Sequence, residues 1–167
     1  MFRAVLISMF ITSTAIADTW TVDDDGKADF DNIQAAVDAV EWQRAAYYDQ
    51  SYAGTWALAL GMVDHLAYDG YQVLDANALK SWMDARIEDG EASVVVFCQD
   101  AAPDTVAESM DSDCTLRRYL DAGGKIIWYG DVPLYYQGHE DGTLTYWGTA
   151  GSLAVLGFNA AGGLWNG

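Results

Sequence analysis

Short apolar segments with the character of strands alternate with helix-like segments from residue 44 onward, and this alternation constrains the fold most. The four strand-like segments are residues 45–48, 71–74, 93–98 and 125–130. Between them, apolar residues recur at helical spacing, and Asp75 and Gly90 are typical residues to bound one such helix. The third segment is apolar almost throughout, as in a strand that is buried on both faces. The pattern predicts an α/β fold with a flavodoxin-like, doubly wound parallel sheet in three α/β/α layers.

The predicted elements become shorter after residue 100. Thr105 and Glu108 have the spacing of a capping box, which predicts a short helix after them. A further helix carries Leu116 and ends before Gly123, residues 144–147 resemble a weak strand, and residues 151–157 begin a last helix. No strand follows this helix in the sequence. We therefore expect a sheet that is incomplete at its C-terminus, because the sequence is a fragment or because a partner or further segment completes it.

The first 17 residues have the features of a secretory signal peptide. Arg3 supplies a positive charge, residues 4–11 form an apolar core, and residues 15–17 form a small-residue cleavage motif. We therefore expect a secreted or periplasmic protein that is cleaved after the motif. The remaining chain divides into a short strand–turn–helix segment at 18–43 and one α/β domain at 44–167.

Acidic residues outnumber basic residues by 25 to 8, which gives the chain a net charge of −17. Removing residues 1–17, which hold one basic and no acidic residue, leaves 150 residues with a net charge of −18. Such a chain repels phosphate backbones and anionic lipids, so we predict no nucleic-acid partner. No later apolar run reaches about 18 residues, so no membrane attachment is expected after signal removal.

The two cysteines lie at the end of a predicted strand (Cys98) and at the start of a predicted helix (Cys114). These positions meet at one edge of a β–α unit, so we predict a disulfide between them in an oxidising compartment. The alternative is a pair of buried free thiols. The chain has two histidines and no Cys-x-x-Cys motif, and we predict neither a metal site nor a cofactor.

Polar and aromatic residues follow three of the predicted strands. The candidate ligand-binding residues are Asp49, Ser51 and Tyr52 after the first strand, Gln99 and Asp100 after the third, and Asp131 and Tyr135 after the fourth. The carboxyl ends of parallel strands meet at one edge of a sheet, where open α/β folds bind ligands. Carboxylates and amides suit sugar hydroxyls and aromatic rings stack on sugars, so one interpretation is a carbohydrate site, with a raised pKa on at least one of the clustered carboxyls. The other interpretation is a set of turn and capping residues.

Three stretches of the α/β domain carry a resemblance to a known superfamily. They are Val94-Val95-Val96-Phe97, Pro103-Asp104-Thr105-Val106, and the run LRRYLDAGGKIIWYGD at 116–131. Residues 44–160 thereby resemble the class I glutamine-amidotransferase-like superfamily, in the branch of trehalose-utilisation-like proteins and β-galactosidase trimerisation domains. Active amidotransferases hold their cysteine in a Gly-x-Cys-x-Gly turn and have a His-x-Glu partner motif. Cys98 lacks both flanking glycines and His139 lacks that glutamate, so the resemblance implies the fold without the activity.

The segment WTVDDDGKADFDNIQAAVDA, within residues 20–40, resembles a second family. It is similar to the opening of secreted right-handed parallel β-helix proteins of the pectin-lyase-like superfamily, in which a strand and a helix cap the first coil. The family's next strand and coil corner are replaced here by Glu41-Trp42-Gln43-Arg44, and no solenoid repeat follows.

These observations predict an exported, non-catalytic glutamine-amidotransferase-like module that binds carbohydrate or another protein domain. The alternative is the N-terminal fragment of a secreted β-helix-type polysaccharide lyase or hydrolase. A third interpretation is a hydrolase that uses Cys98 or the carboxylates of Asp49, Asp100 and Asp131. If the protein is an enzyme, we expect a carbohydrate-active hydrolase or lyase.

Overall fold

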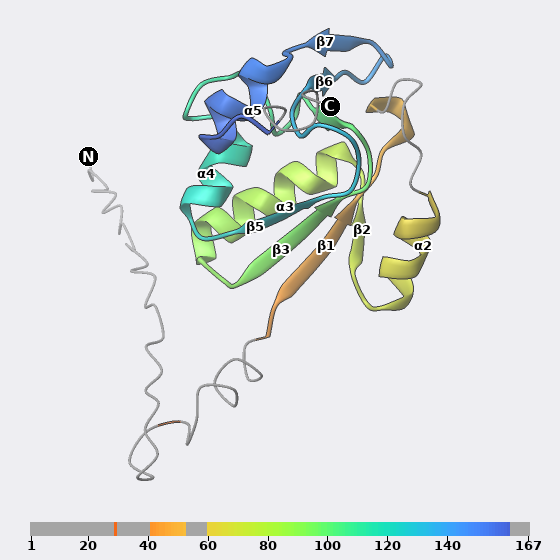
Figure 1. Ribbon diagram of the computed structural model, residues 1–167. Helices are drawn as coiled ribbons and strands as arrows, with labels where there is room; N and C mark the ends of the chain where they lie inside the picture. Colours follow the sequence, from red (N-terminus) through yellow and green to blue (C-terminus); the bar gives the residue numbers. More distant parts are fainter. Residues whose placement is uncertain (1–28, 30–40, 53–59, 161–167) are drawn as a thin grey trace, which may run out of the picture.

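The computed structural model describes residue 29 and residues 41–52 and 60–160 (Figure 1). The predicted signal peptide, and the predicted strand and helix of the 18–43 segment, lie outside the described residues. Within the described residues, no helix has both the length and the apolar character needed to cross a membrane.

Four parallel strands form the main sheet. They are β1 (Gln43–Tyr47), β2 (Gln72–Leu74), β3 (Ser93–Phe97) and β5 (Lys125–Trp128), in the order β2-β1-β3-β5. The helices between them are α2 (Leu60–Tyr68), α3 (Ala76–Asp89) and α4 (Thr115–Asp121). The chain runs from β1 to one edge of the sheet, returns past β1 to β3, and continues to β5 at the other edge. This topology confirms the predicted α/β fold with a doubly wound parallel sheet between helices.

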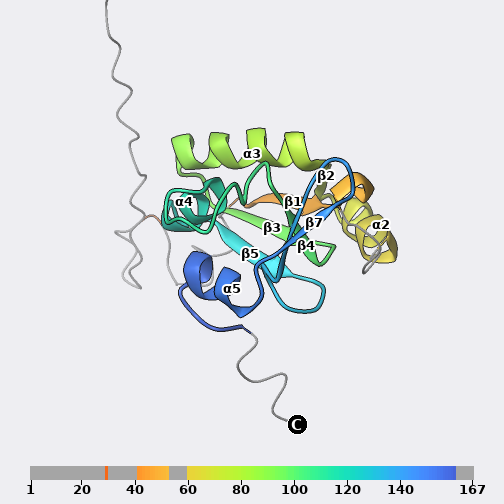
Figure 2. The same ribbon diagram turned by 90° about the horizontal axis from the view of Figure 1, so that it is seen from above.

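The helices cover the two faces of the main sheet unequally (Figure 2). On one face, here called the α3 face, the core lies beneath α3, α4 and the last helix, α5 (Thr149–Leu156). An aromatic row runs through this core at the carboxyl ends of the strands, where Tyr47, Phe97 and Trp128 pair in register. The ring centroids of Tyr47 and Phe97 are 5.2 Å apart, and those of Phe97 and Trp128 are 5.0 Å apart.

The opposite face, here called the α2 face, carries a smaller core. Its buried residues are Ala46, Val63, Leu66, Val96 and Cys98, and α2 packs against β1 and β2. Side chains alternate between the faces along each strand, so neighbouring residues of β3 enter different cores. Both faces of β3 are therefore apolar, as its sequence predicts.

Residues at the ends of α3 show why this segment forms a helix where it does. The Asp75 carboxylate accepts a hydrogen bond from the Ala78 backbone N–H at 2.8 Å, which caps the first turn. At the other end, Gly90 has a φ of 67°, and its N–H donates to the Arg86 carbonyl. A left-handed residue at this position is most readily glycine. Both predicted caps of this helix are confirmed.

A second, smaller sheet follows the carboxyl edge of the main sheet. It has the order β4-β6-β7, with β4 (Ala101–Pro103) parallel to β6 (Tyr136–Gly138) and β6 antiparallel to β7 (Leu144–Tyr146). A Cβ atom at Gly138 would lie 2.1 Å from the carbonyl oxygen of Tyr52, so this sheet packs directly on the one-turn 3-10 helix η1 (Gln50–Tyr52). The sequence predicted β7 and α5 but neither β4 nor β6.

The capping-box prediction after Thr105 is wrong. Residues 104–106 form a turn, and the Thr105 hydroxyl donates to the Ala76 carbonyl of α3 at 2.9 Å. Glu108 caps a different helix, because its carboxylate accepts from the backbone N–H of Thr115 at 2.9 Å and from the Thr115 hydroxyl at 2.5 Å. The spacing of Thr105 and Glu108 thus reflects two separate long-range contacts.

The predicted Cys98–Cys114 disulfide is also wrong in this structure, because both thiols are free and buried. Cys98 lies in the core of the α2 face, with Ala46 and Val96. Cys114 lies in the core of the α3 face. Cys98 follows β3 and Cys114 precedes α4, so both lie where the prediction put them along the chain. Their side chains, however, lie on opposite faces of the main sheet.

Candidate functional site

The carboxyl edge of the main sheet brings together the segments that follow β1, β3 and β5, as predicted. The Asp49 N–H donates to the Gln99 side-chain carbonyl at 2.8 Å, which joins the first two segments. The Asp131 N–H donates to the Asp100 carboxylate at 2.5 Å, which joins the second and third. Four of the predicted residues, Asp49, Gln99, Asp100 and Asp131, therefore lie along one edge in two hydrogen-bonded pairs.

Gln99 is the centre of this edge and has no exposed surface. Besides accepting from Asp49, its amide Nε2 lies 3.2 Å from the Tyr47 hydroxyl and 3.2 Å from the Ala101 carbonyl oxygen. It thus links β1, the segment after β1, and β4. A buried amide with all its bonds made inside the protein holds these elements together and does not face a ligand.

Asp49, Ser51 and Tyr52 also serve the scaffold. The Asp49 carboxylate accepts from the Ser51 N–H at 3.0 Å and from the Ala76 N–H at 3.2 Å. The second bond satisfies a backbone donor in the first turn of α3, where a negative charge is stabilised. Tyr52 is only 4% exposed. For these residues, the interpretation as turn and capping residues accounts for the contacts.

Asp100 and Asp131 remain beside solvent. Asp131 is exposed, and Asp100 is half-buried against Gly130, where a Cβ atom would lie 2.0 Å from the Asp100 carboxylate oxygen. Burial raises the pKa of the Asp100 carboxyl, the hydrogen bond from the Asp131 N–H opposes this, and the Asp131 charge adds to it. The pKa of Asp100 is therefore raised, but mainly through burial and only to a lesser extent through the repulsion between carboxylates from which a raised pKa was predicted.

Three tyrosines cluster near Asp131. The ring centroids of Tyr135 lie 5.1 Å from Tyr136 and 5.0 Å from Tyr146, in edge-to-face geometry, and the Tyr135 and Tyr146 hydroxyls are 3.0 Å apart. The hydrogen bond with Tyr146 is the main cause of a raised pKa at Tyr135, to which the Asp131 charge also contributes. Tyr146 is 65% exposed. The sequence analysis named Tyr135 but missed Tyr146, although Tyr146 lies in the weak strand that it predicted.

A hydrogen-bonded row of three side chains crosses the small sheet. His139 Nδ1 lies 2.6 Å from an Asp104 carboxylate oxygen, and His139 Nε2 lies 2.7 Å from the Thr145 hydroxyl. Asp104 follows β4, His139 follows β6 and Thr145 is in β7. The sequence could not place these residues together, because nothing in it indicated that β4 pairs with β6.

Cys98 has the properties of an inert core residue. It has no exposed surface, and burial raises the pKa of its thiol to about 11. A thiol with that pKa is neutral at physiological pH, whereas the thiolate is the nucleophile. The described residues also contain no group of three or more His, Cys, Asp or Glu side chains arranged to hold a metal ion.

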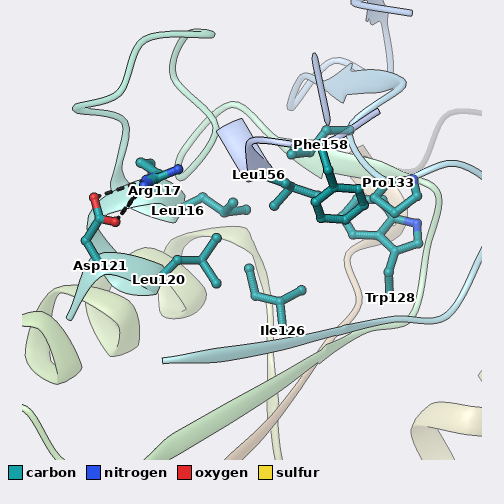
Figure 3. A pocket seen from close by; sticks show the side chains of 10 residues that line it. Leu116, Arg117, Leu120, Asp121, Ile126, Trp128, Pro133, Leu156 and Phe158 are labelled. Atoms are coloured by element: carbon teal, nitrogen blue, oxygen red, sulfur yellow. Dashed lines mark hydrogen bonds and ion pairs between the residues drawn. The ribbon is translucent and has the colours of Figure 1, made fainter. Parts of the chain in front are cut away.

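A hollow of about 470 Å³ opens on the α3 face beside β5 (Figure 3). One wall carries Trp128, Pro133, Leu156 and Phe158, and the ion pair between Arg117 and Asp121 lies at the opposite end. Leu120 and Ile126 lie between them. This lining is apolar apart from the ion pair, and none of its residues is among the predicted ligand-binding residues.

Residues 43–161, from the start of β1 to just beyond α5, match the MJECL34 family. A relative in Methanocaldococcus jannaschii, "Uncharacterized protein MJECL34", is 36% identical over 104 residues, which cover 57% of this chain and 35% of the relative. This chain thus matches only about a third of the relative's length, and no solved structure matches it. Because the family match covers more than half of the chain, the protein belongs to the MJECL34 family.

Proposed function

We propose that this protein is an exported, non-catalytic module that binds neutral carbohydrate at the carboxyl edge of its main sheet. The observation that carries this proposal is the cluster of Tyr135, Tyr136 and Tyr146 near Asp131, in which the ring of Tyr146 is exposed. Aromatic rings with a polar handle bind at wet interfaces, where one side of the ligand is apolar and the other is polar. Sugars have this character.

The residues divide the binding between them. Tyr146 offers an exposed ring for stacking, and its hydroxyl is already held by Tyr135, so the ring loses little freedom on binding. Asp131 is an exposed acceptor for sugar hydroxyls. A net charge of −18 after signal removal favours a neutral ligand over an anionic one.

Two features support a module without catalysis: the buried thiol of Cys98, and the side chains at the carboxyl edge of the sheet that are already hydrogen-bonded within the protein. Cys98 is buried and protonated, and it lacks the glycines that expose a nucleophilic cysteine in glutamine amidotransferases. Asp49 and Gln99 use their side chains to hold the scaffold. We propose on the same grounds that the domain is an inactive glutamine-amidotransferase-like domain, which the doubly wound sheet supports.

Binding is tested with neutral cello-, xylo-, malto- and manno-oligosaccharides by isothermal titration calorimetry. We expect at least one series to bind, and we expect Tyr146→Ala and Asp131→Asn each to weaken binding by about 1–2 kcal/mol. Tyr68→Ala and Asp64→Asn, exposed residues of α2, are matched controls and should bind as the wild type does.

Two results would contradict this function. One is a lack of binding to all four neutral series. The other is binding to polygalacturonate that Tyr146→Ala leaves unchanged, which would support the β-helix lyase alternative instead. Export is tested separately by the intact mass of secreted protein, which should begin at Asp18.

A second candidate function is hydrolysis, which one observation favours. Thr145, His139 and Asp104 are hydrogen-bonded in the order of a hydroxyl nucleophile, a base and an orienting carboxylate. Turnover of p-nitrophenyl acetate that is lost in Thr145→Val and His139→Gln, but kept in Thr143→Val, would assign this role. Equal rates in all three variants would leave the row with the structural role of tying β6 and β7 to β4.

A further inference from the structure

The sheet edge at β5 and the adjoining part of the α2 face are open in the described chain, and the sequence before β1 has the pattern of a strand followed by a helix of matching size. We propose that residues 20–22 pair with the outer edge of β5 as a fifth parallel strand. In the same arrangement, residues 31–40 form the crossover helix that covers the α2 face over β3 and β5.

The open edge follows from the strand order and the hydrogen bonding of β5. No described strand lies beyond β5 in the main sheet. The Tyr129 N–H donates to the Phe97 carbonyl at 2.8 Å, so Tyr129 directs its N–H toward β3. Alternate residues of a strand point their backbone groups to the same side, so Ile126 and Trp128 direct their N–H groups to the outer edge. Such an edge is a template for another strand.

The open face is the α2 face of the same strand. Ile127 pairs with Val96, whose side chain lies in the core of the α2 face, so Ile127 and Tyr129 face that side. Ile127 is 51% exposed and Tyr129 is 49% exposed. A hollow of about 560 Å³ continues this face at the amino ends of the strands, lined by Glu41, Trp42, Gln43, Arg44, Tyr71 and Val94. Large apolar side chains on a sheet face, such as those of Ile127 and Tyr129, are normally covered by another element.

The proposed strand beside β5 also accounts for the hollow on the α3 face. The aromatic row of Tyr47, Phe97 and Trp128 ends at β5, and Trp128 lines the hollow of Figure 3. A strand beside β5 would place every second side chain into this hollow. In the segment Trp20-Thr21-Val22, the two apolar residues Trp20 and Val22 are two positions apart and thus point to the same side.

The handedness of parallel crossovers selects the face for the helix. Strand–helix–strand connections are nearly always right-handed, so crossovers that run in opposite directions across a sheet place their helices on opposite faces. The crossover from β1 to β2 runs toward the β2 edge, and its helix α2 lies on the α2 face. The crossover from β2 to β3 runs in the opposite direction, and its helix α3 lies on the α3 face. A crossover from a strand outside β5 to β1 moves toward the β2 edge. Its helix must therefore lie on the α2 face, where Ile127 and Tyr129 are exposed.

The segment before β1 fits this place in length, polarity and charge. Ile33, Ala36, Val37 and Val40 form an apolar stripe at helical spacing. Ten helical residues span about 15 Å, similar to the strands they would cross, and the stripe ends three residues before β1. A helix that runs down to β1 brings Asp38 to the amino ends of the strands, where Arg44 and Lys125 are exposed.

Amide exchange measured by NMR on the chain without residues 1–17 tests the fifth strand. We expect the outward N–H groups of Ile126 and Trp128 to exchange at least about a hundredfold more slowly than in an open edge, like those of Ile127 and Tyr129. Fast exchange at Ile126 and Trp128, with Ile127 and Tyr129 protected, would overturn the proposal. Protection that disappears on dilution, in step with a dimer seen by sedimentation, would also overturn it, because a second copy would then cover the edge.

Two matched pairs of variants test the helix. Ala36→Asp lies on the apolar stripe and Ala35→Asp lies on the opposite side, and both add the same charge. We expect Ala36→Asp to lower Tm by about 4 °C or more and to speed exchange at Ile126 and Trp128, and we expect Ala35→Asp to leave both nearly unchanged. Equal behaviour of the two variants would contradict a helix packed on the sheet.

The second pair probes the receiving face. Ile127→Asp and Val73→Asp alter half-exposed residues of the two edge strands on the α2 face. If residues 31–40 cover β5, Ile127→Asp lowers Tm by about 4 °C more than Val73→Asp does. Equal shifts would show that nothing covers Ile127.

Discussion

The two sheets of this protein are held together by different forces. The main sheet rests on apolar contacts, above all the row of Tyr47, Phe97 and Trp128 and the side chains of α3 and α4 beneath it. The small sheet has strands of three residues each and less apolar packing, chiefly buried Ala102 and the ring contact between Tyr136 and Tyr146. Hydrogen bonds of its side chains supply much of the rest: Gln137 Nε2 donates to the Ala107 carbonyl at 2.7 Å, and His139 is bonded on both ring nitrogens. The stabilising free energy from apolar packing grows with the apolar area that is buried, whereas each hydrogen bond adds only about 1 kcal/mol.

This difference assigns separate roles to the two regions. The main sheet is the stable scaffold, and the small sheet with its neighbouring loops is the region expected to open at lower free energy. The exposed side chains of the proposed site, Asp131 and Tyr146, belong to this second region. Binding residues are commonly carried by such segments on a rigid scaffold.

The largest expected effect comes from the contact that joins the two regions. A Cβ atom in Gly138→Ala would lie 2.1 Å from the Tyr52 carbonyl, and backbone must shift to relieve it. We expect a loss of about 3 kcal/mol in the free energy of unfolding, measured by urea denaturation. Gly61→Ala, in α2 with no atom within 4 Å of the new Cβ, should instead gain about 0.5–1 kcal/mol. A similar small change in both variants would show that the small sheet does not pack on η1.

The buried glutamines give the next largest effect. Gln99→Leu leaves the Asp49 N–H, the Tyr47 hydroxyl and the Ala101 carbonyl without this partner, and we expect a loss of about 2 kcal/mol. Gln137→Leu removes one short hydrogen bond, to Ala107, and should cost about 1 kcal/mol. If Gln137→Leu is the more costly in urea denaturation, Gln99 is not the link between the two sheets.

A smaller and more local effect is expected at His139. His139→Ala removes both bonds of the row to Asp104 and Thr145, so amide exchange should quicken in β6 and β7 while β1 and β3 keep their protection. His65→Ala is the control, since His65 is an exposed residue of α2 that pairs with Asp69, just beyond the helix. Quickened exchange throughout the main sheet would contradict the separation of the two regions.

The sequence predicted the main sheet well and the small sheet poorly, for a physical reason. The strand at 93–98 and the capped helix between Asp75 and Gly90 are specified by local periodicity and caps, which a sequence displays directly. β4 and β6 have three residues each and pair across more than 30 residues of chain, so no local pattern announces them.

The same limit applies to the candidate site. The chemistry of Asp131 and Tyr135 could be predicted because they follow a strand of the parallel sheet. The contact of Tyr135 with Tyr146 could not be predicted, because the pairing of β6 with β7 places Tyr146 beside it. The disulfide prediction failed for a related reason: chain position placed Cys98 and Cys114 near one edge, but not on one face.

The smallest expected effect is the pH dependence at Asp100. Burial raises the pKa of Asp100 in the folded protein, so the folded state binds this proton more tightly than the unfolded state does. As pH rises from the ordinary carboxyl pKa through the folded value, the wild type should lose stability relative to Asp100→Asn. Asp141, whose pKa is lowered by hydrogen bonds from Thr143, should show the opposite trend against Asp141→Asn. Thermal melts between about pH 3 and pH 7 check both signs.

The central claim is that the carboxyl edge and its tyrosine cluster bind a neutral sugar while the main sheet acts as scaffold. An NMR titration of the ¹⁵N-labelled chain with each of the four neutral oligosaccharide series tests it most directly. We predict that the binding series shifts the amide signals of Asp131, Tyr135 and Tyr146 and leaves those of α2 and α3 in place. Shifts confined to Leu120, Ile126 and Phe158 around the hollow beside β5, or no shifts with any series, would contradict it.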